Sequence, residues 1–284
     1  MIKGENSVKN IPFTKLQGLG NDFLIIEVED INKLPEPAKL AQQMCQRNYG
    51  AGADGIVFVA PSTPSVAPFT SRIFNADGSE AEISGNGTRC LAAYLYYKAR
   101  WTANEINIAT LAGIKCGRLV KRDGRQFEFE FAMGEPRFAS SEIPVILDTP
   151  LPQVINYPLM MGGEPQGITC VSMGNPHCTT FWPSFDKIDI DELGSLLEHH
   201  PAFPERTNVE FVRVISTEEI EVLFWERGVG RTLSSGTGSS GASIAAMMNG
   251  FTNRSVKVNT LGGDLRVNWR EDNVVMLTGS AEVI

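Results

Sequence analysis

The sequence predicts an α/β (α+β) fold with two pseudo-symmetric lobes from internal duplication, each a curved mixed sheet wrapped around a central helix. The first observation behind this prediction is a motif that occurs twice, at 84–93 and at 235–246: Ser-Gly-x-Gly, then small residues, then Ala-Ala. The second is that other features precede both copies in the same order and at similar distances. A chain of 284 residues is also long enough for two domains.

A Gly-Asn pair lies upstream of each copy of the motif. Asn21 stands 63 positions before Ser84, and Asn175 stands 60 positions before Ser235. An apolar run follows 33 positions after each of these asparagines, beginning at Asp54 and at Asn208. Such agreement over long distances indicates that one half of the chain repeats the other.

Helices and strands are expected at matching places in both halves. Helical patterns at 37–48 and 189–200 precede the two apolar runs, and Asp189 is a candidate N-cap for the second. Nine positions before each Ser-Gly-x-Gly a polar residue ends a strand, Asn75 in one half and Glu226 in the other. Alternating patterns predict further strands at 22–28, 105–110, 126–133, 218–226 and 255–260.

The helix after each Ser-Gly-x-Gly is apolar around most of its circumference, so we expect the sheet to enclose it. Each half closes on a strand ending in glycine, at 128–134 and at 274–279. We place the first lobe at 1–133 and the second at 134–273, with the strand at about 274–284 as a candidate to cross back to the first lobe.

Charge and hydropathy exclude several classes of function. A formal net charge of −8 and a pI near 5.1, without a basic run, argue against nucleic acid as a partner. No segment of about 18 apolar residues is present, and the polar stretch 1–10 lacks the apolar core of a signal peptide. We therefore expect a cytoplasmic protein that does not bind membranes.

The cysteines and histidines do not form a recognisable metal or disulfide pattern. Three histidines and five irregularly spaced cysteines favour reduced, packed thiols and argue against a metal site. No nucleotide-binding motif is apparent, so we expect neither a metal nor an organic cofactor. The cysteines are Cys45, Cys90, Cys116, Cys170 and Cys178.

Glycines at a junction between a strand and a helix allow backbone N–H groups to approach a ligand closely. The helix N-terminus adds partial positive charge, which favours an anion such as a carboxylate. Taken singly, each motif is more often a glycine-rich turn without a ligand. Two copies in pseudo-symmetric lobes would instead point two helix ends into one cleft, where Gly85, Asn86, Gly236 and Thr237 could bind a small molecule.

Six strings together resemble the diaminopimelate epimerases, which are cofactor-independent amino-acid epimerases. They occur in the family's order from residue 13 to about 280. The strings are GLGNDF at 18–23, FNADGSE at 74–80, GNGTRC at 85–90, SMGNPHC at 172–178, FPER at 203–206 followed by Asn208, and ERG at 226–228.

The resemblance implies inversion of the α-carbon of LL-diaminopimelate to the meso form, a step of lysine and peptidoglycan precursor synthesis, without pyridoxal phosphate or metal. In the family, two cysteines act from opposite faces of the substrate, one as a thiolate base and the other as a thiol acid. His177 falls beside the implied site. As a partner, a second copy of the chain in a homodimer is left open. The implied substrate-binding positions are Asn21, Asn75, Asn175, Asn208, Glu226 and Arg227.

Ser84 and Ser235 stand where the family has its two cysteines. A hydroxyl ionises near pH ~15–16 and a free thiol near ~8.5, so the serines should be poor bases on their own. Two smaller departures are Gly55, where the family tends to have a polar side chain, and Arg231, where an acidic residue is common. Cys90 and Cys178 are expected to be buried packing residues that do not substitute.

Three explanations of the serines stay open. The chain could be an epimerase branch in which the serines act with another base. It could instead be a related isomerase or dehydratase of another small acid, or a non-catalytic amino-acid binder. Finally, the serines could have been engineered to trap a ligand. The retained polar residues favour an amino-acid-like ligand in every case.

Overall fold

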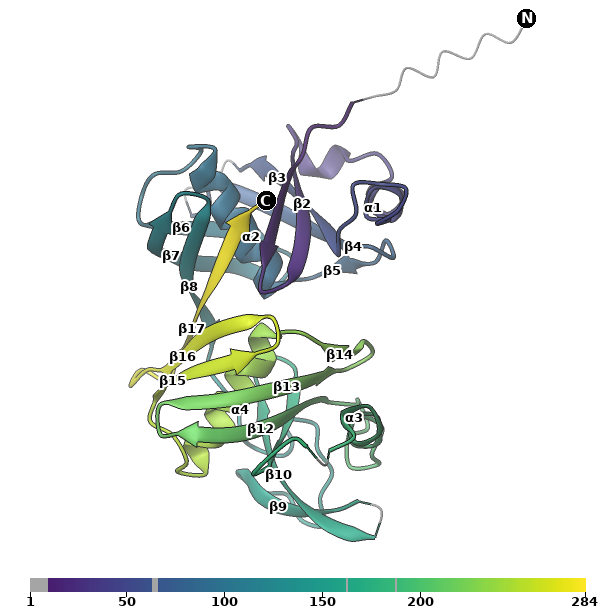
Figure 1. The fold of residues 1–284 in the computed structure, drawn as a ribbon, viewed down its shortest axis with the longest axis vertical. Coiled ribbons are helices and arrows are strands. Elements are labelled where there is room, and N and C mark those ends of the chain that lie inside the picture. The colour runs from purple at the N-terminus through teal and green to yellow at the C-terminus, as the bar shows by residue number, and fades with distance from the viewer. Residues whose placement is uncertain (1–9, 63–65, 162, 187) are drawn as a thin grey trace, which may run out of the picture.

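The structure, a computed structural model, describes residues 10–62, 66–161, 163–186 and 188–284. It has a mixed α+β fold with two lobes, as the sequence predicts, and each lobe is a barrel of strands around one helix (Figure 1). The strands of the described residues form one continuous 17-stranded sheet. Both central helices, α2 (Gly85–Tyr97) and α4 (Gly236–Met248), lie inside the strands of their lobes.

The barrel of the first lobe closes through the last strand of the chain. Strand β17 (Val275–Val283) pairs with β8 on one side and with β1 on the other, where Leu16 lies opposite Val283. Helix α1 (Pro37–Met44) and the short 3-10 helix η1 (Ile31–Lys33) lie outside this barrel. Its other strands are β1 (Thr14–Gly18), β2 (Asn21–Glu27), β3 (Gly55–Pro61), β4 (Phe69–Asn75), β5 (Glu80–Ala81), β6 (Glu105–Thr110), β7 (Gly113–Asp123) and β8 (Gln126–Gly134).

The barrel of the second lobe uses the opposite ends of the same two strands. The first residues of β17 pair with β16, and the chain just beyond β8 forms an antiparallel bridge between Arg137 and Ser172 of β10. Helix α3 (Ile190–Glu198) lies outside. The remaining strands are β9 (Val154–Met161), β10 (Glu164–Ser172), β11 (Pro176–Phe181), β12 (Asn208–Ser216), β13 (Glu219–Glu226), β14 (Gly230–Thr232), β15 (Ser255–Thr260) and β16 (Gly263–Trp269).

Apart from η1 in the first lobe and β9 in the second, the two lobes have equivalent elements in the same order. Parallel pairing of β2 with β3 matches that of β11 with β12, and a short strand precedes each central helix. This correspondence supports internal duplication, which stays an inference. Strand β8 ends at Gly134, beside the lobe boundary that we infer at 133–134.

Apolar packing explains why the central helices sit inside the barrels. Eleven of the 13 residues of α2 are buried, and Leu91 and Leu95 pack in one core cluster with Phe127 and Phe129 of β8. Nine residues of α4 are buried in the same way, with Ile244 in the core cluster of the second lobe. The expected covering of both helices is therefore confirmed.

The outer helices are shorter than the sequence predicts. Helix α1 ends at Met44 instead of residue 48, because the chain then turns back and Gly52, with a φ of +70°, donates to the Met44 carbonyl at 3.0 Å. Helix α3 ends at Glu198 instead of residue 200. Asp189 is its N-cap, as predicted, and accepts from the N–H groups of Asp191 and Glu192. Within the described ranges, no helix is long and apolar enough to cross a membrane.

Candidate functional site

A cavity of about 860 Å³ is lined by residues of both lobes. Eleven of the thirteen site residues expected from the sequence line it, including Ser84 and Ser235. The other two, Asn208 and His177, are buried within the second lobe. The eleven are Asn21, Asn75, Ser84, Gly85, Asn86, Asn175, Glu226, Arg227, Ser235, Gly236 and Thr237.

The two serines occupy equivalent positions at the helix N-termini. Ser84 has φ −133° and ψ 121°, and its Oγ accepts from the N–H of Gly87 at 3.1 Å. Ser235 has φ −132° and ψ 128°, and its Oγ accepts from the N–H of Gly238 at 3.2 Å. Each serine is thus an N-cap, and each helix leaves its first two N–H groups without an intrahelical acceptor. Both helix ends can therefore receive an anion.

The neighbours of the two serines differ in charge. Ser235 Oγ also donates to Glu226 Oε2 at 3.2 Å, so its hydroxyl contacts a carboxylate. At the equivalent place in the first lobe stands Asn75, whose amide donates to Ser79 Oγ at 2.9 Å. Among the described residues, therefore, Ser235 has an ionisable side chain hydrogen-bonded to its hydroxyl and Ser84 has none.

Amide side chains form a hydrogen-bonded chain on the wall of the first lobe. Asn86 Nδ2 donates to Asn21 Oδ1 at 3.3 Å, and Asn21 Nδ2 donates to Asp54 Oδ2 at 2.7 Å. Arg89 Nη2 donates to Asn86 Oδ1. Arg89 also lines the cavity, although we did not expect it from the sequence.

A second chain lies on the wall of the other lobe and explains the place of His177. Its Nε2 contacts Asn175 Oδ1 at 3.0 Å, and its Nδ1 contacts Glu210 Oε1 at 2.6 Å. Asn175 Nδ2 reaches Thr237 Oγ1 at 3.5 Å. Burial raises the pKa of the Glu210 carboxyl, although the neighbouring His177 opposes this. Glu210 was missed because it falls inside an apolar strand pattern.

Asn208 supports the cavity without lining it. Its Nδ2 donates to the Pro176 carbonyl at 2.8 Å, and its Oδ1 accepts from the backbone N–H of Arg227 at 3.1 Å. The Arg227 side chain is anchored to the Glu205 carbonyl at 3.0 Å. Asn208 therefore fixes the turn that carries Glu226 and Arg227.

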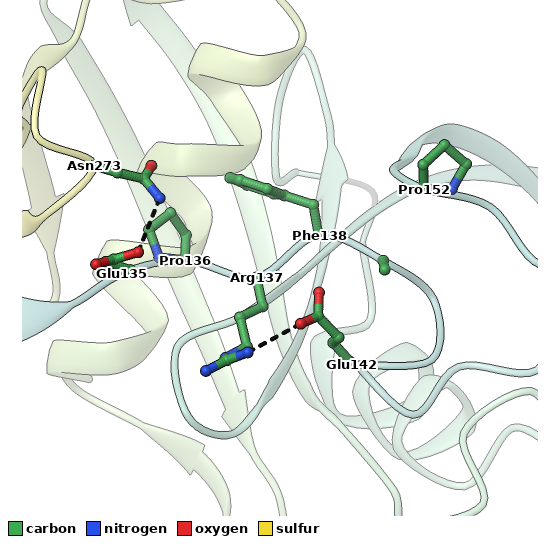
Figure 2. Close-up of a pocket in the computed structure, with 8 residues that line it drawn as sticks. Glu135, Pro136, Arg137, Phe138, Glu142, Pro152 and Asn273 are labelled. Carbon is green, nitrogen blue, oxygen red and sulfur yellow. Dashed lines mark hydrogen bonds and ion pairs between the residues drawn. The ribbon is translucent and has the colours of Figure 1, made fainter.

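A second depression, of about 620 Å³, lies where the chain leaves β8 and shares Glu135 and Arg137 with the larger cavity (Figure 2). There Arg137 pairs with Glu142 at 3.0 Å, and Asn273 donates to Glu135 at 3.4 Å. None of the residues expected from the sequence to form the site lines it. We therefore take the larger cavity between the lobes as the candidate site.

The other departures noted in the sequence lie away from this cavity. A Cβ on Gly55 would stand 2.7 Å from the Phe74 carbonyl oxygen, so the backbone leaves no room there for a side chain. Arg231 lines a different surface depression, beside Asp189.

Cys90 and Cys178 are fully buried, which confirms that they pack in the core. Burial raises the pKa of Cys90 to about 12. A hydrogen bond with Cys170, together with burial, also raises the pKa of Cys178 well above its ordinary value. Both thiols are therefore unsuited to proton transfer. Among the described residues, no group of three or more His, Cys, Asp or Glu side chains could hold a metal ion.

Solved structures share the two-lobed fold at low sequence identity. A probable proline racemase from Agrobacterium radiobacter K84 superposes with a TM-score of 0.67 at 14% identity, over 97% of this chain and 91% of that chain. A protein of the phenazine biosynthesis PhzF family from Bacillus anthracis gives 0.67 at 16% identity, over 98% of both chains. The chain thus has the fold that these proteins share.

Among proteins with this fold, sequence comparison identifies the family of the chain. The family model for diaminopimelate epimerase matches residues 13–139 and 169–284. A diaminopimelate epimerase from Pelotomaculum thermopropionicum is 46% identical over 274 residues, and one from Halothermothrix orenii is 43% identical over 274 residues; each alignment covers 96% of both chains. The chain belongs to the diaminopimelate epimerase family.

Proposed function

We propose that the chain is an amino-acid isomerase of the diaminopimelate epimerase type, with the α-carbon of diaminopimelate held between Ser84 and Ser235. In this proposal the two serines occupy the positions of the family's catalytic cysteines. The observation that carries it is that both serines cap equivalent helices and line one cavity. A cytoplasmic location and a homodimer remain predictions.

The charges around the cavity suit a zwitterion. Free N–H groups at the two helix ends, on Gly85 and Asn86 and on Gly236 and Thr237, would bind a carboxylate. The Glu226 carboxylate would accept hydrogen bonds from an ammonium group. We therefore expect ligands that carry both groups to bind more tightly than ligands that lack either.

Proton transfer should be weak and one-sided in this chain. A helix N-terminus stabilises a negative charge by up to about 2 kcal/mol, or roughly 1.5 pK units, which cannot bring a hydroxyl near neutrality. Ser235 has Glu226 as a hydrogen-bonded acceptor at 3.2 Å, whereas Ser84 has no ionisable partner among the described residues. Any slow α-proton exchange should therefore occur at the Ser235 face.

Isothermal titration calorimetry with LL- and meso-diaminopimelate tests the binding part of the proposal. We expect saturable binding by the native protein, and about tenfold or greater loss of affinity in Glu226→Gln through loss of one charge-assisted hydrogen bond. Arg118→Met, which removes an exposed ion pair with Glu130 on the outer strands, is the matched control and should bind normally. Absence of binding at millimolar ligand by folded protein would contradict the proposal.

A non-catalytic amino-acid binder is the second candidate. It is favoured by the environment of Ser84, whose Oγ serves as a helix cap and contacts no ionisable group in the described part of the chain. This candidate predicts the same calorimetric titration but no α-proton exchange on either face. Any α-proton exchange catalysed by the native protein would therefore favour the isomerase over the binder, whereas both candidates use the same binding site.

A further inference from the structure

Arg89 is a buried cation that has no acidic partner among the described residues. It lies on α2, one turn after Ser84, and is 1% exposed although it lines the cavity. In the described part of the chain, the hydrogen bonds and charges recorded around its guanidinium include no carboxylate. Its bonds go to neutral oxygens, Asn86 Oδ1 and the Ser280 carbonyl, the latter at 3.4 Å. Burial lowers the pKa of Arg89 to about 10, so it remains charged at neutral pH.

This cation sets the direction of the amide chain on the wall of the first lobe. A guanidinium only donates, so the Asn86 atom that faces Arg89 must be its oxygen. Asn86 then turns its nitrogen to the oxygen of Asn21. Asn21 in turn donates to Asp54, whose carboxylate only accepts. A donor at one end and an acceptor at the other therefore fix the orientation of both amides.

The fixed orientation determines which groups the wall can offer to a ligand. Each of the two amides uses one N–H within the chain and keeps a second N–H for other partners. The N–H groups of Gly85 and Asn86 at the start of α2 are also unused within the helix. With the positive charge of Arg89 beneath them, these donors favour a ligand carboxylate.

We propose that Arg89 is a positioning residue: through Asn86 it holds the Asn86 and Asn21 amides in the orientation that receives a carboxylate of the ligand. This inference rests on the proposed function for the identity of the ligand. The inference also gives the two lobes different affinities for an anion. In the second lobe the place of Arg89 is taken by Ser240, which is uncharged and donates to the Gly236 carbonyl at 2.9 Å. One carboxylate of an extended diamino acid should therefore prefer the first lobe.

The test combines calorimetry with NMR of protein labelled with ¹⁵N-asparagine. Arg89→Met should weaken meso-diaminopimelate binding about tenfold or more, the loss expected for a hydrogen-bonding network fixed by a charge. Arg89→Lys keeps a cationic donor and should restore most of the affinity. In Arg89→Met the side-chain amide signals of Asn86 and Asn21 should move, while the Arg118→Met control leaves both unchanged. Wild-type affinity or unmoved amide signals in Arg89→Met would overturn the inference.

Arg89 is fully buried, so Arg89→Met could fail to fold, and Asn86→Leu then provides the same test. It cuts the chain between Arg89 and Asn21, and should shift the Asn21 amide signals and weaken binding at least tenfold. Unchanged signals and affinity would overturn the inference. If the native protein binds no diaminopimelate, the proposed function fails; the amide signals, which need no ligand, still decide the role of Arg89.

Discussion

Glu198 of α3 fixes the turn that carries Glu226 and Arg227, so its replacement should affect both stability and binding. Glu198 is 2% exposed, and its carboxylate accepts from Trp225 Nε1 at 2.7 Å and from the Gly228 N–H at 2.9 Å. These donors flank the two site residues in the sequence, so a single side chain holds both ends of the turn. Glu198 thus links the outer helix to the cavity.

The expected magnitudes follow from these two bonds. A hydrogen bond to a charged group contributes about 1.5–3 kcal/mol, so Glu198→Ala should lower the free energy of unfolding by about 3–6 kcal/mol. Glu198→Gln keeps one acceptor and should lose about half of that. The matched control is Gln42→Ala on α1, whose exposed amide donates to the Asp77 carbonyl at 2.7 Å, and which should lose under about 1 kcal/mol.

The pH dependence of this stabilisation has a defined sign. Burial alone would raise the pKa of Glu198, but the hydrogen bonds from Trp225 and Gly228, together with the nearby His199 and Arg206, outweigh it and hold the pKa below its ordinary value. A carboxyl with a lowered pKa in the folded state stabilises the protein above its unfolded pKa, about 4.3. That contribution is lost as the pH falls through the folded pKa. The difference in free energy of unfolding between native protein and Glu198→Gln should therefore shrink in acid.

Urea unfolding of native protein, both Glu198 variants and Gln42→Ala provides the measurement, followed by calorimetry with meso-diaminopimelate. We expect Glu198→Gln to remain folded at neutral pH and to bind more weakly than the native protein. If the free energy of unfolding of Glu198→Ala lay within about 0.5 kcal/mol of the native value, the role of Glu198 would be refuted. Substitutions at exposed sites typically change this free energy by no more than that.

Three further outcomes follow from the packing and burial. Gly241→Ala should cost about 1–3 kcal/mol in urea unfolding, because its Cβ would lie 2.9 Å from His177 Cβ; full native stability would contradict this packing. Ellman's reagent should modify only the exposed Cys116 quickly in native protein and all five cysteines after unfolding. A second thiol that reacts quickly in native protein would contradict the burial of the other four. Glu210→Gln should gain stability relative to native protein as the pH rises from 4 to 8. Burial raises the pKa of Glu210, so the stabilising contribution of this carboxyl is lost as the pH rises through that pKa. A difference in free energy of unfolding that stays constant over this pH range would contradict the prediction.

Local patterns predicted much of the fold because each is decided by nearby residues. The two helices after the Ser-Gly-x-Gly turns and the N-cap Asp189 depend on spacing and capping alone. Closure of the barrels depends on pairing between distant strands, as between Leu277 and Phe131. No local pattern encodes that register, so the sequence could suggest only that the last strand crosses back.

In the cavity, too, the residues found from the sequence are those that a local motif marks. Ser84 and Ser235 were found because they stand in a repeated motif. Arg89 was missed, although it lies in the first copy, because an arginine on a helix is ordinarily solvated and only its burial reveals a role. Glu198 was missed because nothing in its helix shows that it reaches the turn between Trp225 and Gly228.

Deuterium incorporation at the α-carbon of LL- and meso-diaminopimelate in D₂O tests most directly the proposal that the serines stand at the proton-transfer positions. It should be measured for native protein, Ser84→Cys, Ser235→Cys and the double variant. We expect slow or no exchange by the native protein, exchange on one face by each single variant, and epimerisation by the double variant, because a helix N-terminus can bring a thiol pKa near neutrality. Rapid two-sided exchange by native protein, or a double variant that binds but does not exchange, would contradict it.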